Sequence, residues 1–309
     1  ATHGKTGSPT IAFATSFGSH MVLQREPYVA TIWGTATDMP TSTVVKVDLF
    51  TTSGRKTPVL SINATVNDTS KEWVATFPCP MVGSTTVTYF ITASVRSFPA
   101  STIQLEDVLF GDVYVASGQS NMAFLLKNAF NGSVLVQDAN NYPNIRLFTS
   151  KKIASTVPLS QQPEVEEKWS VGSNYSVLMH SNTEDDNWLY MSAVAWLFAR
   201  TVHRAVGIPI GILNTNWGGT PIEFWMSADA LNACPHPPPS SVGDSQAPTQ
   251  GWNGMIVPLL RTSVRGVIWY QGENNAGQKN GAELYKCRFP AMIADWRLKF
   301  ASFKYFGFV

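Results

Sequence analysis

The sequence predicts an α/β protein in two parts, a β-sandwich-like domain over residues 8–106 and an α/β domain over residues 107–309. Three observations lead to this prediction. The length of 309 residues suits two domains at about 150 residues each. The first third of the chain consists of short stretches rich in β-branched and aromatic residues. From about residue 107 onward, apolar strands alternate with segments of helical periodicity.

The amino-terminal part predicts short strands separated by polar turns. Between Val45 and Leu49, apolar and polar side chains alternate with the period of two expected of a strand that buries one face. Several such strands at intervals of about a dozen residues, with no helical period between them, are typical of a β-sandwich. The predicted strands span residues 29–34, 44–50, 59–66, 73–77 and 86–93.

The second part predicts alternating strands and helices, which indicates a mostly parallel sheet covered on both faces. Val194, Phe198 and Val202 lie on one stripe of the clearest helix. The polar stretches 161–188 and 234–251 are expected to be loops. The predicted strands span residues 108–116, 144–149, 210–215, 265–270 and 305–309. One predicted helix begins at Ser120, and the others span residues 191–206, 252–260 and 283–300.

The composition excludes several classes of protein. Charged residues make up only 14 %, against roughly 25 % in typical soluble domains. Because 22 Lys and Arg nearly balance 21 Asp and Glu, there is no basic excess to bind phosphates, and we expect no nucleic-acid partner. No apolar run approaches the roughly 18–20 residues that span a bilayer, so we also expect no membrane partner.

Four acceptor sequons for N-glycosylation, at Asn63, Asn67, Asn131 and Asn174, favour a secreted or lysosomal glycoprotein. The polar residues 1–9 contain no hydrophobic signal core, so a secreted chain would begin here after its signal had been removed. Attached glycans would supply the solubility that the sparse charges do not.

The three cysteines, Cys79, Cys234 and Cys287, are too few for a disulfide scaffold and wrongly spaced for zinc. Two interpretations stay open. All three are buried thiols, or one disulfide forms, with Cys234 and Cys287 the most plausible pair and Cys79 left free.

Polar turns that contain glycine follow three of the predicted strands. They span residues 117–122, 216–220 and 270–275. In an open parallel sheet, ligands bind beyond the carboxyl ends of the strands. We therefore expect the three turns to converge at one edge of the sheet and to form the functional site.

Ser120, in the first turn, is the candidate nucleophile, because the free N–H groups of a helix that begins there would stabilise an oxyanion. A plain helix N-cap is the alternative role for this serine. The turn differs from the G-x-S-x-G elbow of the α/β-hydrolases, since Met122 occupies the place of the second glycine.

The other two turns carry groups suited to the same chemistry. Gly218 and Gly219 have no side chains and so let a substrate approach a backbone N–H closely, although they could also form only a tight turn. Gln271 and Asn275 are neutral donors suited to an alkoxide, and Glu273 could orient a histidine or hold a substrate hydroxyl.

From about residue 11 to its last residue, the chain resembles the sialate O-acetylesterases of the SGNH hydrolase superfamily. The turns supply the most specific blocks, which read S-G-Q-S-N-M at residues 117–122, W-G-G-T-P-I-E at 217–223 and W-Y-Q-G-E-x-N at 269–275. Flanking blocks match at residues 21–27, 109–113, 191–194, 252–256 and 289–297.

This resemblance implies a flavodoxin-like three-layer hydrolase domain beside the β-sandwich-like domain. It also implies that O-acetyl groups are removed from sialic acids through an acetyl-enzyme, with no metal or organic cofactor. By the resemblance, Ser120 is the nucleophile and Glu273 an acidic partner of the base. The implied oxyanion hole combines the N–H of Ser120, the N–H of Gly218 or Gly219, and the side chain of Gln271 or Asn275.

The chain departs from the superfamily at the base, which resembling enzymes take from a D-x-x-H block. No histidine here has an aspartate three positions earlier; the five are His3, His20, His180, His203 and His236. We expect the base on a carboxyl-terminal segment or a second chain. The alternatives are that His180 or His236 substitutes from a loop, or that the chain is catalytically dead.

Two other functions remain open at this point. An acetylesterase acting on another polysaccharide, such as acetylated xylan, would share the three blocks and differ in its loops. A non-catalytic glycan-binding module would use some of the 10 Trp and 9 Tyr as stacking surfaces for sugars, although most of these rings are expected to pack in the core.

Overall fold

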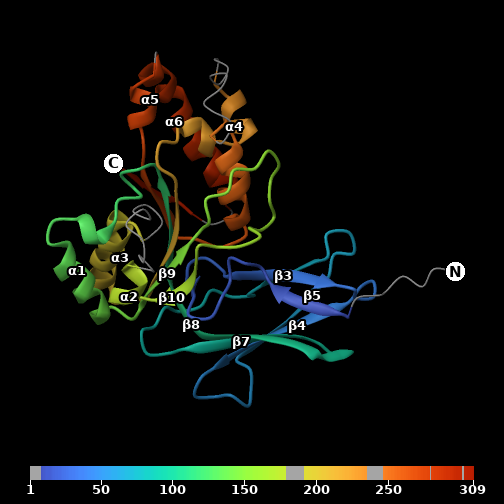
Figure 1. The fold of residues 1–309 in the computed structure, drawn as a ribbon. Coiled ribbons are helices and arrows are strands. Elements are labelled where there is room, and N and C mark those ends of the chain that lie inside the picture. Colours follow the sequence, from blue (N-terminus) through green and yellow to red (C-terminus); the bar gives the residue numbers. More distant parts are fainter. Residues whose placement is uncertain (1–7, 179–190, 235–245, 279, 301–302) are drawn as a thin grey trace.

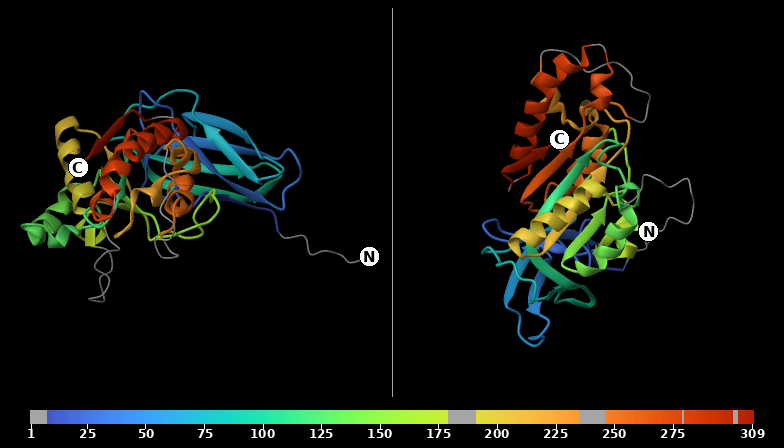
Figure 2. Two further views of the ribbon diagram at one scale, coloured as in Figure 1. Left: turned by 90° about the horizontal axis from the view of Figure 1, so that it is seen from above. Right: turned by 90° about the vertical axis from the view of Figure 1, so that its left-hand side faces the viewer.

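The computed structural model describes residues 8–178, 191–234, 246–278, 280–300 and 303–309. Figure 1 shows a β-rich amino-terminal part beside a larger part in which helices flank a sheet. Figure 2 shows the same arrangement from above and from one side.

Antiparallel strands make up the amino-terminal part. One sheet has the order β1 (Thr10–Phe13), β3 (Thr31–Thr37), β6 (Glu72–Thr76). The other joins β5 (Leu60–Thr65), β4 (Val44–Thr51) and β7 (Tyr89–Val95) to the first half of β8 (Phe98–Gly118). The short β2 (Val22–Gln24) runs parallel to β8. Trp33 and Trp73 from the first sheet share a core with Val47 from the second, so the two sheets bury their inner faces against each other.

The strand β8 belongs to both parts of the molecule. Its first half pairs antiparallel with β7, and its second half enters the parallel sheet. Asp107, which has a φ of 51°, lies where the pairing changes. The expected division of the chain at residue 107 therefore falls within one strand, and it stays a prediction.

The second half of β8 is central in a mostly parallel sheet. The strand order is β10 (Glu167–Val171), β9 (Ile145–Thr149), β11 (Ile210–Asn216), β8, β12 (Gly266–Tyr270), β13 (Tyr305–Phe308). Only the edge strand β10 is antiparallel to its neighbour. A mostly parallel sheet is what the alternation of strands and helices predicted.

Helices cover both faces of this sheet (Figure 1). One face carries α1 (Gly132–Asp138), α2 (Asn174–Leu178) and α3 (Ala193–Val206), and the other carries α4 (Ala228–Asn232) and α6 (Gly281–Lys299), with the short α5 (Glu273–Ala276) near the carboxyl edge. Alternate residues of β8 face the two layers: Ala116 packs in one core with Trp196 of α3, and Val115 packs in the other with Trp296 of α6. The three-layer α/β prediction is confirmed.

The remaining elements are short helical turns. They are η1 (Leu126–Asn128), η2 (Ala139–Asn141), η3 (Ile222–Trp225), the π-helical η4 (Trp252–Ile256) and η5 (Val257–Leu259). The single helix predicted over residues 252–260 is thus two short pieces, because Pro258 lacks the backbone N–H that would continue the hydrogen-bonding ladder.

The prediction of a helix beginning at Ser120 is wrong, because residues 119–123 form turns. Gly118 has a φ of 143° and passes so close to β12 that a Cβ there would lie 2.1 Å from the carbonyl oxygen of Tyr270. The backbone N–H of Gln119 then bonds this same oxygen at 3.0 Å. This contact with the neighbouring strand replaces the start of a helix.

The prediction of a loop over residues 161–188 is also wrong in part, since β10 and α2 lie within it. The edge strand β10 mixes charged and apolar residues, and this hides it from a search for apolar runs. Residues 179–190, and residues 235–245 of the second expected loop, lie outside the described residues.

Three of the four sequon asparagines, Asn63, Asn67 and Asn131, are exposed, and Asn174 is half-buried at the start of α2. Glycosylation at these sites stays a prediction. In the part of the chain that the structure describes, no helix is both long enough and apolar enough to cross a membrane.

Candidate active site

The three glycine-containing turns leave the sheet at the same level. Gly118 at the end of β8 is in register with Asn216 of β11 on one side and with Tyr270 of β12 on the other. Between β11 and β12 the chain also crosses from one side of β8 to the other, and such switch points are where open parallel sheets bind ligands. The expected convergence of the turns is thus present in the structure.

Ser120 lies beside the second turn. A Cβ placed on Gly218 would come within 3.6 Å of the Ser120 Cβ, so the open side of this glycine faces the serine. Ser120 itself is partly exposed. Among the described residues, no acceptor faces the backbone N–H of Ser120, Gly218 or Gly219. These three groups are therefore available to a negatively charged oxygen.

Hydrogen bonds to two of its carbonyl groups hold the second turn in place. The Thr220 hydroxyl donates to the Trp217 carbonyl at 2.7 Å, and the Gln246 side-chain amide donates to the Gly218 carbonyl at 3.3 Å. Since the carbonyl and the N–H of one trans peptide point in opposite directions, each of these bonds also fixes an N–H direction.

Gln119 binds the third turn to the first. It is 4 % exposed, and its side-chain oxygen accepts from the Gln271 side chain at 3.0 Å. The same oxygen accepts from the backbone N–H of Gly272 at 3.4 Å and of Asn274 at 3.1 Å. One buried carbonyl therefore fixes three points of the turn that follows β12.

Gln271 and Asn275 use their donors within the protein. The Gln271 Nε2 contacts the side-chain oxygens of Gln119 and Asn275, the latter at 2.8 Å, and the Thr220 carbonyl at 3.1 Å. The Asn275 Nδ2 donates to both carboxylate oxygens of Glu223, at 3.2 and 3.0 Å. Their place in the oxyanion hole stays a prediction, since both side-chain nitrogens already have acceptors within the protein.

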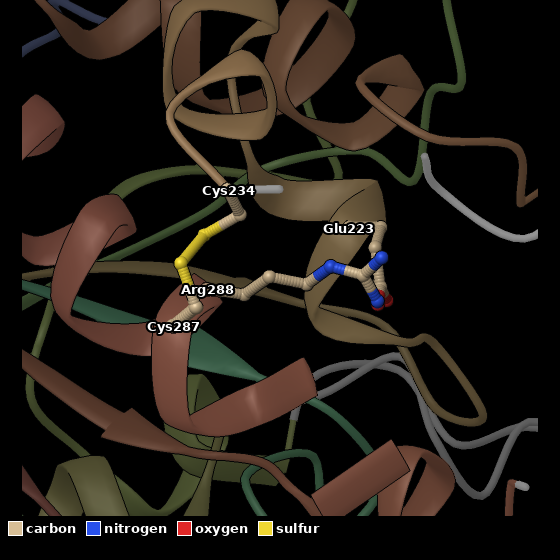
Figure 3. Close-up of a disulfide and its surroundings, with 4 residues drawn as sticks. All are labelled: Glu223, Cys234, Cys287 and Arg288. Atoms are coloured by element: carbon tan, nitrogen blue, oxygen red, sulfur yellow. A yellow bond between two sulfur atoms is a disulfide. The ribbon is translucent and has the colours of Figure 1, made fainter. Parts of the chain in front are cut away.

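A buried ion pair continues this network to α6. Arg288 and Glu223, with side chains 1 % and 0 % exposed, are hydrogen-bonded to each other. Cys287, next to Arg288, forms a disulfide with Cys234 across a Cα–Cα distance of 5.9 Å (Figure 3). Cys79 is a free, exposed thiol. The ion pair and the disulfide together attach η3, which follows the second turn, and the end of α4 to α6.

Tyr285 of α6 supports the third turn from below. Its hydroxyl donates to the Gln271 carbonyl and accepts from the Trp269 indole, each at 3.3 Å. Burial raises the pKa of Tyr285 to about 12, although the bond from Trp269 opposes this. The phenol therefore stays protonated at neutral pH and holds the backbone in place.

Glu273 begins α5, is exposed, and accepts a hydrogen bond from the Asn121 side chain. It is thus tied to the residue that follows Ser120. Its role as the acidic partner of a base stays a prediction, because no histidine in the described residues contacts it.

The two described histidines lie at the opposite end of the sheet from Ser120. His20 bonds Asp107 at 2.8 Å, and Asp107 is separated from Gly118 by roughly 35 Å of extended strand at about 3.3 Å per residue. His203 bonds the carbonyl of Ile208, just before β11 begins. His3, His180 and His236 lie outside the described residues.

A row of buried polar side chains crosses the same sheet near its carboxyl edge. Glu167 is 3 % exposed and accepts from Ser170 at 2.5 Å and Thr149 at 3.2 Å. The row continues through Asn214 to Asn216, whose amide donates to Asn214 at 2.6 Å. Burial raises the pKa of Glu167 to about 7, against the opposing effect of the two hydroxyls.

Sequence reasoning missed several residues that organise this site. Gln119 and Asn121 flank Ser120 in the first block, and Glu223 ends the second. Their signal was an amide or carboxylate beside a glycine turn in an otherwise apolar context. Asn274 carries the same signal in the third block, two residues after Gly272. Arg288 gave none, because it lies in a helix and its partner Glu223 is far away in the sequence.

The three-layer α/β fold, with a serine, a Gly-Gly turn and buried amides at the carboxyl edge of its sheet, is of the SGNH-like class. A family model described as carbohydrate esterase, sialic acid-specific acetylesterase matches residues 110–304. The chain belongs to this family.

Curated relatives agree with this assignment. The chain is 36 % identical to proteins named sialate O-acetylesterase from Pongo abelii and Homo sapiens, over 93 % of its own length and 53 % of theirs. The Mus musculus protein of the same name is 34 % identical over 93 % of this chain and 56 % of its own. The chain thus spans about half the length of the curated relatives it matches.

A solved structure, that of a carbohydrate acetylesterase from Xanthomonas citri, shares the fold with a TM-score of 0.76 and 29 % sequence identity. The match covers 95 % of this chain and 58 % of the other.

Proposed function

We propose that this chain is the serine-esterase part of an enzyme that removes O-acetyl groups from sialic acids. The observation that carries the proposal is Ser120 beside a Gly218–Gly219 turn, with backbone N–H groups that face no acceptor among the described residues. Membership of the sialic acid-specific acetylesterase family supports the substrate.

In the proposed reaction, a base takes the proton of Ser120 and the hydroxyl oxygen attacks the acetyl carbonyl carbon. The carbonyl electron pair moves onto its oxygen, where the N–H groups of Ser120 and of Gly218 or Gly219 stabilise it. The C–O bond to the sugar then breaks, the sugar oxygen takes the proton from the base, and acetyl-Ser120 remains. Water repeats the sequence and releases acetate.

The base in this proposal comes from outside the described residues, because His20 and His203 lie at the far end of the sheet. Either His180 or His236 of this chain supplies it, or a carboxyl-terminal segment or second chain does. Glu273 would then orient the base. Acetate release should be compared between purified protein with and without such a segment. Only the version that holds the base will release acetate.

The third oxyanion donor is tested by comparing Gln271→Ala with Asn275→Ala. Removing one true donor costs typically 2.7–4 kcal/mol of transition-state stabilisation, a loss of about 10²–10³ in kcat. Turnover of O-acetylated sialic acid should therefore differ sharply between the two variants if only one side chain donates. Equal and small losses would refute a side-chain donor and leave the hole to backbone groups.

An acetylesterase acting on another polysaccharide is the second candidate, since the Xanthomonas citri relative is described only as a carbohydrate acetylesterase. Acetate release should be compared on O-acetylated sialic acid and on acetylated xylan. Faster release from xylan would reject sialic acid as the substrate. Labelling by a fluorophosphonate that disappears in Ser120→Ala would separately reject a non-catalytic glycan-binding module.

A secreted or lysosomal route, with glycans on Asn63, Asn67, Asn131 and Asn174, completes the proposal. The exposure of three of these side chains supports it. Intact mass before and after treatment with an N-glycosidase, on protein from a eukaryotic host, tests each site when single Asn→Gln variants are included. An unchanged mass would reject glycosylation.

A further inference from the structure

We propose that Asn274 is a positioning residue, which holds the carboxyl-terminal side of the Gly218–Gly219 turn in place before charge develops on the substrate. This inference rests on the proposed esterase function of the site. It concerns a side chain that does not touch the substrate and acts through the backbone of the turn.

The contact that carries the inference is short and well directed. The Asn274 side-chain amide donates to the carbonyl oxygen of Gly219 at 2.6 Å. This bond joins the turn after β12 to the turn after β11, across the carboxyl edge of the sheet. It therefore sets the position of one turn relative to the other.

Asn274 is itself held from two sides. Its side-chain oxygen accepts from the Gln278 amide at 2.7 Å, which settles which end of the Asn274 amide faces Gly219. Its backbone N–H donates at 3.1 Å to the side-chain oxygen of Gln119, the residue before Ser120. The residue whose donor reaches Gly219 is thus anchored to the side chain next to Ser120 in the sequence.

The turn needs such an anchor because glycine peptides rotate easily. Gly219 has a φ of 76° and carries no Cβ, so its flanking peptides could adopt several orientations at little cost. The bond from Gln246 holds the peptide that carries the Gly219 N–H. The bond from Asn274 holds the next peptide, between Gly219 and Thr220, and so fixes how the chain leaves the turn. Donors fixed in advance need no reorganisation when the oxyanion forms, which is the source of their catalytic effect.

Charge at position 274 should matter as well as hydrogen bonding. A carboxylate there would face the Gly219 carbonyl oxygen and repel it, instead of donating to it. The Asn274→Asp variant should therefore turn this peptide away, whereas Asn274→Ala only releases it. Glu283→Gln is the matched control, because Glu283 is exposed on α6 and has no bond to the turns.

The kinetic experiment measures kcat and KM for acetate release from an aryl acetate and from O-acetylated sialic acid, using the active form of the enzyme. We expect kcat to fall roughly tenfold in Asn274→Ala and further in Asn274→Asp, short of the 10²–10³ lost with a whole donor. KM and the melting temperature should stay near the wild-type values, as should every property of Glu283→Gln. An unchanged kcat in Asn274→Ala, or a loss confined to KM, would overturn the inference.

A structural experiment separates this inference from the proposed function. Crystal structures of the wild type and Asn274→Ala should show the Gly219 carbonyl in one orientation in the first and turned or disordered in the second. If the wild type releases no acetate, the proposed function fails, and these structures still decide the role of Asn274. A Gly219 peptide that is equally ordered and identically oriented in both would refute that role.

Discussion

The buried carboxyl of Glu167 makes the stability of this protein depend on pH in a defined window. Burial raises its pKa from 4.5 to about 7 in the folded protein. Between these two pH values the folded state keeps a proton that the unfolded chain releases. Rising pH therefore favours unfolding, by up to 1.36 kcal/mol per pH unit and about 3 kcal/mol across the window.

Replacing Glu167 by Gln removes this titration and places an amide of similar shape between Thr149 and Ser170. The free energy of unfolding should be measured in urea by tryptophan fluorescence, from pH 4 to pH 8. The wild-type value minus the Glu167→Gln value should fall by about 3 kcal/mol between pH 4.5 and 7, and stay level outside that window. All other carboxyl groups cancel in this difference.

Glu283→Gln is the matched control, because Glu283 is an exposed carboxyl on α6. An exposed substitution usually changes stability by less than about 0.5 kcal/mol, so its difference from the wild type should stay flat with pH. A flat difference for Glu167→Gln as well would refute the reasoning, since it would show that the carboxyl ionises as readily when buried as when exposed.

Three further variants test the supports of the site. Arg288→Met leaves the buried Glu223 carboxylate without its charged partner and should lower the free energy of unfolding in urea by about 3–5 kcal/mol. Adding Glu223→Gln should recover part of this loss, and a loss below about 1 kcal/mol would contradict the pairing. Replacing Cys234 and Cys287 by Ser opens a link across 53 residues and should lower the free energy of unfolding by about 4 kcal/mol, so an unchanged value would argue against the disulfide. Gly218→Ala places a methyl group 3.6 Å from the Ser120 Cβ. This variant should lower kcat/KM for acetate release without changing the melting temperature. Full activity would show that the substrate approaches from elsewhere.

The sequence patterns predicted the frame of the molecule because local periodicity reports burial. The strands β9, β11 and β12 are buried along almost all of their length, as expected of strands covered on both faces, and they lie within two residues of the predicted ranges. The edge strand β10 escaped notice because only one side of it is paired and its sequence is mixed.

The turns show where local reasoning ends. Their glycines and their position after each strand predicted that they would meet. The contacts that organise them join residues far apart in the chain, such as Gln119 with Asn274 and Glu223 with Arg288. A residue such as Gln119 looks like an ordinary amide in the sequence, and only the fold shows that its oxygen accepts three hydrogen bonds.

The continuity of β8 has a consequence for how the protein comes apart. A cut at residue 107 would divide a single strand and expose Val108, Leu109 and Phe110, each of which is fully buried. The core of the amino-terminal sheets runs on into the layer that holds α6, so the amino-terminal part has no apolar interior separate from that layer. Heating should therefore melt both parts in one cooperative transition. Damage to the outer sandwich should lower the amount of folded protein and leave the geometry around Ser120 unchanged in the molecules that fold.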